Sequence, residues 1–217
     1  MKKLLMSLAL GSITLVSFGQ TDPAAKKILN EVSKKYNSYK SIQSDFTLKI
    51  QDSNKKVEST SGIMSFYKPK NQYAISLKDQ EIISDGKSVW SIAKDIKEVQ
   101  VTENENNGNT IGPNNLFTFY QKGYKYVLMP DEKITRQGKS EMAKVIELSP
   151  EDTKTNYFKI KLRINKNNHI QDLTIFDKSS NQYTYTINSL YLGKNFDAKI
   201  FSFSKDKYKD YEVVDLR

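Results

Sequence analysis

The chain of 217 residues contains no cysteine. Disulfide bonds, thiolate zinc sites and cysteine nucleophiles are therefore excluded. A bacterial protein that carries its own lipid anchor needs a cysteine at its cleavage site, so we expect no lipid anchor here. The fold has to rely on the burial of apolar side chains, and a chain of this length is large enough to do so as one domain.

Histidine is almost as scarce, since His169 is the only one. It lies in the polar turn 167–169, where a lone histidine is typical of a surface residue. Without a second histidine or a cysteine, no histidine-based metal site can form, and a lone histidine in a polar turn does not indicate the base of a catalytic triad. The acidic residues are scattered, and phosphate-, dinucleotide- and calcium-binding loops are missing. The sequence predicts a protein that is not an enzyme and needs no cofactor or metal.

Arginine is rare as well, because only three of the 34 basic residues are arginine and the rest are lysine. Proteins that read nucleic acids favour arginine for its bidentate contacts with bases and phosphates. The formal net charge of +9 is therefore interpreted as a solvated, lysine-rich surface. Such a surface predicts no nucleic-acid partner and at most transient contact with an anionic membrane or an acidic partner.

The sequence has only one long apolar run, at its beginning. Lys2 and Lys3 precede the apolar residues 4–16, and the small residues Ser17 and Gly19 follow. This pattern predicts a signal peptide over residues 1–19, cleaved after Gly19, and an exported domain over residues 20–217. An uncleaved membrane anchor is the alternative, but the run is short for a membrane span.

The next segment has the pattern of an amphipathic helix. Asp22 and Pro23 are a typical helix start, with a capping residue before a proline at the first helical position. Ile28, Leu29, Val32, Tyr36 and Tyr39 then recur at helical spacing opposite a lysine-rich face. We expect a helix of about four turns, as this spacing implies.

Beyond this helix the apolar residues alternate with period two, which predicts strands. Turn residues at 78–80 and 85–87 separate the first strands, and a polar loop follows over residues 103–112. A second helix is predicted over residues 113–122, opened by Pro113 and ended by Gly123. Strands then resume from Tyr124 to about residue 203, giving nine to eleven in total.

These elements predict a mainly β (α+β) fold in a single domain. An antiparallel sheet of about ten strands curls under its own twist into a half-barrel or unclosed barrel. The two helices then have two possible roles on the concave side. They fill it as an ordinary core, or they cover a cavity.

Two segments of the sequence are more specific than this pattern. The strand GIMSFYKP (62–69) and the segment IISDGKSVW (82–90) follow each other in the meander, and the chain ends with DAKIFSF (197–203) and EVVDLR (212–217). In this order they resemble the periplasmic outer-membrane lipoprotein carrier family (LolA-type), over essentially the whole mature chain.

The resemblance implies an unclosed antiparallel β-barrel with a helical lid over a hydrophobic cavity. It implies a monomeric periplasmic chaperone that binds the acyl chains of lipoproteins, receives them from an inner-membrane lipoprotein-releasing ABC transporter and delivers them to an outer-membrane lipoprotein acceptor. The expected cavity wall consists of Phe46, Leu48, Phe66, Tyr73, Ile75, Leu77 and Trp90. The expected lid helix contributes Leu116, Phe117, Phe119 and Tyr120.

The sequence departs from the family pattern at Lys68, where the family has an arginine that latches the lid. Lysine lacks the planar fork of arginine, so Lys68 is a candidate for a looser latch. Two other functions remain as alternatives. One is a lipoprotein- or lipid-binding sensor of envelope stress, and the other is a secreted hydrolase or glycan-binding protein.

Overall fold

The computed structural model describes residues 21–104, 111–136 and 138–217. The predicted signal peptide and most of the predicted loop 103–112 lie outside these ranges. Within them the chain forms one α-helix and twelve strands. Their bounds are α1 Pro23–Asn37, β1 Ser41–Gln51, β2 Val57–Tyr67, β3 Gln72–Leu77, β4 Gln80–Ser84, β5 Ser88–Ala93, β6 Glu98–Glu103, β7 Tyr124–Arg136, β8 Lys139–Pro150, β9 Tyr157–Ile164, β10 Ile170–Asp177, β11 Gln182–Leu192 and β12 Glu212–Asp215. Three short 3₁₀-helices are η1 Lys68–Lys70, η2 Phe119–Gln121 and η3 Ala198–Phe201.

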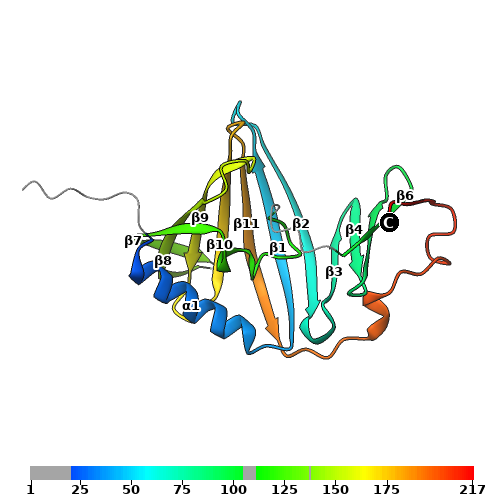
Figure 1. Ribbon diagram of the computed structural model, residues 1–217, viewed down its shortest axis with the longest axis horizontal. Coiled ribbons are helices and arrows are strands. Elements are labelled where there is room, and N and C mark those ends of the chain that lie inside the picture. The colour runs from blue at the N-terminus through cyan, green and yellow to red at the C-terminus, as the bar shows by residue number, and fades with distance from the viewer. Residues whose placement is uncertain (1–20, 105–110, 137) are drawn as a thin grey trace, which may run out of the picture.

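All twelve strands belong to one open sheet, in the order β12-β6-β5-β4-β3-β2-β1-β11-β10-β9-β8-β7. Neighbouring strands are antiparallel, apart from the parallel pair β12 and β6. The pairing of β1 with β11 joins the two halves of the chain in the middle of the sheet. Figure 1 shows the sheet curving, with α1 near β7–β10 and the C-terminus beside β6 at the opposite end. The predicted mainly β, open architecture is confirmed.

The predicted count of nine to eleven strands is wrong by one, and the prediction of strand pattern up to residue 203 is also wrong. The β11 strand ends at Leu192, and the tail, residues 193–211, consists of η3, turns and bends. The tail crosses back over the sheet and ends in β12, which pairs parallel to β6. A parallel neighbour needs such a long connection, and four residues are too short for their alternation to reveal a strand.

Helix α1 forms where the sequence predicts it. The Asp22 carboxylate accepts hydrogen bonds from the backbone N–H groups of Ala24 (2.7 Å) and Ala25 (3.4 Å), which caps the first turn. It also accepts one from the Leu128 N–H on β7 at 3.2 Å. These backbone N–H groups lower the pKa of the Asp22 carboxyl. One side chain therefore caps the helix and ties its start to an edge strand of the sheet.

Two glycines of the GIMSFYKP and IISDGKSVW segments are required by close approach of the backbone. A Cβ atom at Gly62 would lie 2.4 Å from the Ser76 carbonyl oxygen on β3. Gly86, in the turn between β4 and β5, has a φ of +98°, and a Cβ there would lie 2.2 Å from the Lys70 carbonyl oxygen. Gly62 therefore lets β2 pack closely against β3, and Gly86 lets the β4–β5 turn pack closely against η1.

The apolar side chains form two clusters. The main cluster lies between α1, the strands β1–β3 and β7–β11, and the segment 111–123. The second cluster lies between β4–β6 and the tail, and its buried members are Ile83, Ile92, Val99, Val101 and Tyr208. The molecule thus has one core on the side of α1 and a smaller one beneath its C-terminal segment.

Candidate functional site

The predicted lid helix is not an α-helix. Residues 113–118 form turns, and only η2, at Phe119–Gln121, is helical. The Asn115 side chain accepts a hydrogen bond from the Gly112 N–H (3.0 Å), and its carbonyl accepts from the N–H groups of Thr118 (2.8 Å) and Phe119 (3.0 Å), so the segment forms single turns that do not continue into a helix. A helix of this length is marginal in any case, and asparagine and aromatic residues are weak helix formers. Gly123, with a φ of +82°, does end the segment.

This irregular segment, residues 111–123, is referred to below as the aromatic cover. Leu116 and Tyr120 are fully buried in the main cluster, Phe117 is almost fully buried, and Phe119 packs against the same cluster half-buried. The Phe117 ring lies 4.7 Å from the Tyr36 ring on α1 and 5.7 Å from the Phe66 ring on β2. The four residues expected in the lid therefore sit on the concave side of the sheet, without the helix that was predicted to carry them.

Six of the seven expected wall residues belong to the main cluster. Four of them are buried there and two, Leu48 and Leu77, pack against it half-buried. The four buried residues are Phe46, Phe66, Tyr73 and Ile75. Phe66 and Tyr73 are cross-strand partners on β2 and β3, with their rings 6.4 Å apart.

Trp90 does not line the main cluster, contrary to the expected cavity wall. Its ring stacks on Phe203 of the tail, with centroids 5.6 Å apart and planes within 4°. It packs on the second cluster, whereas its neighbour Val89 packs on the main one. Successive residues of a strand point to opposite faces, so an assignment that is off by one position places the side chain on the wrong side.

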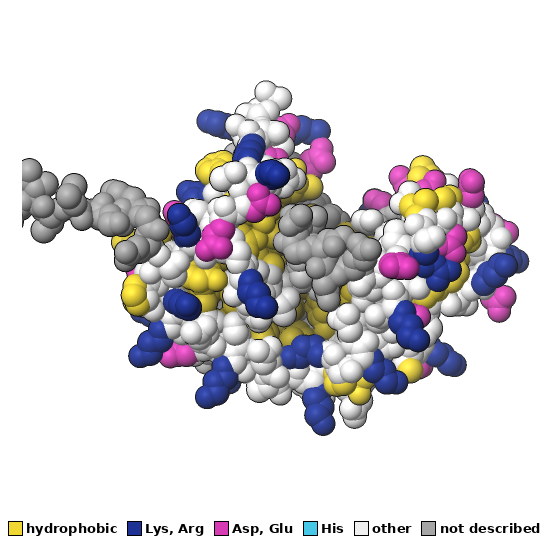
Figure 2. Space-filling model, in the orientation of Figure 1, with side chains coloured by type: hydrophobic (Ala, Val, Ile, Leu, Met, Phe, Trp, Pro, Cys, Tyr) yellow, Lys and Arg dark blue, Asp and Glu magenta, His cyan; other side chains and the backbone are white. Residues whose placement is uncertain are grey.

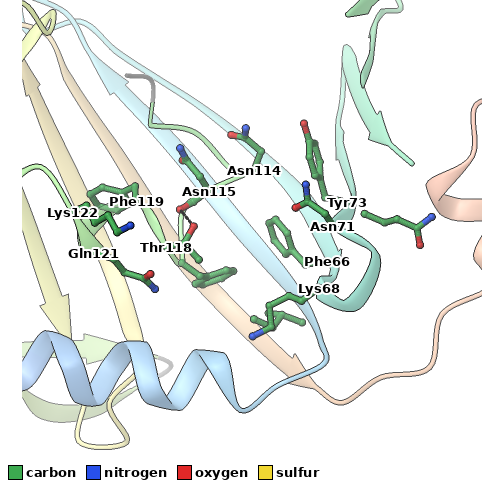
Figure 3. A pocket seen from close by; sticks show the side chains of 13 residues that line it. Phe66, Lys68, Asn71, Tyr73, Asn114, Asn115, Thr118, Phe119, Gln121 and Lys122 are labelled. Atoms are coloured by element: carbon green, nitrogen blue, oxygen red, sulfur yellow. Dashed lines mark hydrogen bonds between the residues drawn. The ribbon is translucent and has the colours of Figure 1, made fainter. Parts of the chain in front are cut away.

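A groove of about 660 Å³ opens between the aromatic cover and the turn from β2 to β3 (Figure 3). Its apolar and aromatic lining residues are Ile42, Phe66, Tyr73, Phe117 and Phe119. Its remaining lining residues are polar: Lys68, Asn71, Gln72, Asn114, Asn115, Thr118, Gln121 and Lys122. Figure 2 shows hydrophobic side chains gathered in the hollowed centre of the molecule. Pockets for small ligands typically measure about 300–1,000 Å³, so the groove has the size of a ligand site.

The groove is not the closed hydrophobic cavity implied by the family resemblance. Leu116, Phe117 and Tyr120 occupy the concave side together with α1, and the groove beside them has a polar rim. Of the two roles left open by the sequence, the structure therefore shows the filled arrangement. The amide residues of the rim, such as Asn71 and Asn114, were missed because their positions carry no periodic signal.

Lys68 lies where the cover, the β2–β3 turn and the end of α1 meet. Its ammonium donates a hydrogen bond to the backbone carbonyl of Tyr36 in the last turn of α1. Cations are favourable near a helix C-terminus, where carbonyl groups lack helical partners. Burial lowers the pKa of the Lys68 ammonium. Lys68, the candidate for the latch, thus contacts the helix.

Tyr36 connects three parts of the molecule at this point. Its hydroxyl accepts a hydrogen bond from the Ile170 N–H on β10 (3.0 Å), while its ring packs on Phe117 and its carbonyl accepts from Lys68. Burial raises the pKa of the Tyr36 hydroxyl. The tyrosine was predicted only as part of an apolar stripe, because nothing in the spacing shows which stripe residue contacts the cover.

His169 is half-buried, and not the free surface residue that its turn predicts. Its Nε2 and the Tyr39 hydroxyl are hydrogen-bonded at 3.0 Å, and its ring lies 5.6 Å from that of Tyr36. Burial lowers the pKa of the imidazole, and the nearby Lys35 ammonium lowers it further. The β9–β10 turn bends onto the end of α1, and local sequence gives no sign of that contact.

One buried polar atom in the cover lacks a partner within the described residues. The Tyr120 hydroxyl makes no hydrogen bond there, although the tyrosine is fully buried. Burial raises the pKa of this hydroxyl to about 12, although a side-chain interaction with Ser33 on α1 lowers it in part. An unpaired buried hydroxyl costs roughly 1–3 kcal/mol, so the cover is held less firmly than its burial suggests.

A family comparison matches this chain over residues 37–204 with the outer membrane lipoprotein carrier protein LolA. The chain therefore belongs to the LolA family. A comparison with curated proteins finds no match. In the described ranges, α1 is too short and too polar to be a membrane span, and no other helix qualifies.

Solved structures of similar fold include an uncharacterised conserved protein from Thermus thermophilus. It has 12% sequence identity and a TM-score of 0.59, and the alignment covers 88% of this chain and 99% of that one. A putative outer membrane lipoprotein-sorting protein domain from Vibrio parahaemolyticus has 10% identity, a TM-score of 0.46 and coverage of 86% and 98%. A LolA superfamily protein from Nitrosomonas europaea has 13% identity, a TM-score of 0.44 and coverage of 82% and 97%. At 12% identity, the likeness to the Thermus thermophilus structure concerns the fold alone.

Proposed function

We propose that this protein is a periplasmic carrier that shields the acyl chains of lipoproteins on their way from the inner to the outer membrane. It takes its cargo from an inner-membrane ABC transporter and delivers it to an outer-membrane acceptor. The signal peptide over residues 1–19 exports it, and it carries no reaction of its own. The observation that carries the proposal is the aromatic cover: a segment without regular helix fills the concave side of an open sheet, beside a groove of ligand size.

The energetics favour a cover that competes with the cargo. Each buried methylene contributes about 0.8 kcal/mol, so exposing one long acyl chain to water costs on the order of 10 kcal/mol. A carrier has to offset this cost and still release the chain at its destination. Phe117 and Leu116 fill the apolar site when no cargo is present, so a ligand gains only the difference between its own burial and theirs.

Lys68 serves as the latch in this proposal. It ties the end of α1 to the β2–β3 turn, and α1 packs on the cover through the ring contact between Tyr36 and Phe117. A single ammonium on a flexible stem holds less firmly than a bidentate arginine. We therefore expect the closed state to open more easily than in relatives with arginine at this position.

Native mass spectrometry tests the proposal. The mature protein is isolated without detergent from its own envelope and weighed intact. We expect one acylated passenger for each loaded protein molecule. A population that carries no lipid-modified passenger, together with failure to solubilise an acylated lipoprotein from vesicles, would contradict the carrier function.

A further inference from the structure

The polar rim of the groove has a one-sided charge. The 13 residues that line it include two lysines and five amide side chains, but no aspartate or glutamate. Lys68 comes from the β2–β3 wall and Lys122 from the end of the aromatic cover, and Figure 3 shows the two on different sides of the groove. A rim that contacted only alkyl chains would not need an excess of positively charged side chains.

Neither lysine has an anionic partner in the part of the chain that the structure describes. The salt bridges formed there include neither Lys68 nor Lys122. Lys68 is half-buried and donates to the Tyr36 carbonyl. A lysine ammonium has three N–H donors, so two are left for a further acceptor. A partly desolvated cation is costly unless it is paired, and a ligand that supplies an anion would offset this cost.

The floor and the rim of the groove together fit an amphiphile. Phe66 and Phe117 offer an aromatic surface for an alkyl chain, and the amides of Asn71 and Asn114 offer hydrogen bonds to ester or amide oxygens above it. We propose that this rim is a head-group subsite that selects acylated ligands with an anionic group, a carboxylate or a phosphate, and that Lys68 and Lys122 are its cations. This inference rests on the acyl-chain site of the proposed function and adds a second class of ligand to it, because the lipid-modified cysteine of a lipoprotein carries neither a carboxylate nor a phosphate.

The position of Lys68 links the head group to the cover. An anion that binds the two remaining N–H groups pulls on the same ammonium that donates to the Tyr36 carbonyl, and so weakens that hydrogen bond. Binding of the head therefore loosens the end of α1, which packs on Phe117. The acyl chain then displaces an aromatic cover that its own head group has helped to release.

Isothermal titration with three ligands that share a twelve-carbon tail tests this inference. Laurate carries a carboxylate, dodecyl phosphate carries a phosphate, and monododecanoylglycerol is neutral, and each is used below its micelle concentration near neutral pH. Hydrogen bonds to charged groups are the stronger ones, so we expect each anionic ligand to bind about tenfold more tightly than the neutral one. The order of the two anions shows whether the subsite suits a fatty acid or a phospholipid head.

The variants Lys68→Met and Lys122→Met assign the preference to these side chains. The readout is the ratio of anionic to neutral affinity, because a change that affects only the binding of the shared alkyl tail alters both affinities equally and cancels from the ratio. We expect this ratio to fall toward one in both variants. Lys209→Met is the matched control, since Lys209 is exposed in the tail and does not line the groove, and its ratio should equal that of the unaltered protein.

The outcomes separate this inference from the proposed function. If the unaltered protein binds all three ligands with equal affinity, or if its preference survives in both variants, the head-group subsite is wrong while the carrier function stands. If none of the three ligands binds, the acyl-chain site itself is wrong. A preference that falls in Lys68→Met and Lys122→Met but not in Lys209→Met supports the subsite.

Discussion

The aromatic cover and the tail are both irregular, aromatic-rich segments that fold back on the same sheet, yet they are held in different ways. In the tail, Phe203 is stacked between Trp90 on one side (5.6 Å) and Tyr208 on the other (5.4 Å). The tail then ends in β12, which adds backbone pairing to β6. The cover has neither a pairing strand nor a continuous ring stack among its described contacts.

The polar contacts of the two segments differ even more. The Glu81 carboxylate on β4 accepts from the Tyr208 hydroxyl (2.6 Å) and pairs with Lys207 (3.0 Å) and Lys94 (2.9 Å). In the cover, Tyr126 on β7 donates to the Tyr120 carbonyl (2.9 Å), but the Tyr120 hydroxyl itself has no partner in the described structure. The comparison suggests that the tail is a permanent strap, whereas the cover is built to be displaced.

The largest effect should come from removing the ring that anchors the strap. Trp90→Ala deletes the stacked partner of Phe203, and large aromatic truncations cost about 3 kcal/mol when the site cannot collapse. We expect a loss of roughly 2–3 kcal/mol in the free energy of unfolding, measured by urea denaturation, because Trp90 is half-buried. Ligand affinity of the folded protein should be unchanged. Reduced affinity would mean that Trp90 belongs to the binding site, and Trp90→Phe should recover most of the stability.

The next largest effect should come from a charge in the cover. Phe117→Glu places a carboxylate against Tyr36 and Phe66, where an acyl chain would have to pack, so we expect acyl binding to weaken about tenfold or more while the sheet remains folded. Titration with a neutral acyl ligand measures the affinity, and far-UV circular dichroism monitors the fold. Unchanged uptake would remove the cover from the mechanism.

A smaller effect of opposite sign is expected at Tyr120. Tyr120→Phe removes the unpaired hydroxyl, so the closed state should gain about 1 kcal/mol in stability and bind acyl ligands about fivefold more weakly. Tyr157→Phe is the matched control, because its hydroxyl is hydrogen-bonded to Tyr124 at 2.6 Å, and its loss should destabilise the protein. If Tyr120→Phe also destabilises it, the hydroxyl has a partner and the cover is not poised to open.

The smallest effect concerns the pH dependence of the strap. Burial alone would raise the pKa of Glu81, but the hydrogen bonds from Tyr208 and the two lysines outweigh it and lower the pKa from 4.5 to about 2. The contribution of ionised Glu81 is therefore fully present above pH 4.5 and is lost as the pH falls toward about 2. We expect Glu81→Gln to flatten the decline of stability in this window relative to the unaltered protein. Identical pH profiles would show that the carboxylate does not hold the tail.

The regular elements could be predicted because local sequence determines them. Asp22 and Pro23 mark the start of α1, and the alternation of Ile160, Leu162 and Ile164 places three buried side chains on one face of β9. The residue before them in the same alternation, Phe158, is about half exposed (52%), since it lies near the end of β9, where the pairing with β10 shifts register. Periodicity predicts which residues share a face of a strand, but not where the burial of that face ends.

The parts that could not be predicted depend on contacts between distant segments. Pro113 and Gly123 have the spacing of helix signals, yet the Asn115 side chain and packing on both α1 and β2 select turns. The face of Trp90 depends on the tail, which arrives more than a hundred residues later. For the candidate site, six of the seven expected wall residues and the four expected lid residues belong to the main cluster or pack against it, and their role in binding stays a prediction. The polar rim and the contact between Lys68 and Tyr36 emerged only from the fold.

Hydrogen exchange with and without a bound acyl ligand tests the contrast between cover and strap most directly. Backbone amides of residues 111–123 and 198–211 are followed by mass spectrometry as laurate is added to the protein. The account predicts that protection of residues 111–123 changes on binding, while that of residues 198–211 stays the same. Equal changes in both segments, or a change confined to the tail, would contradict it.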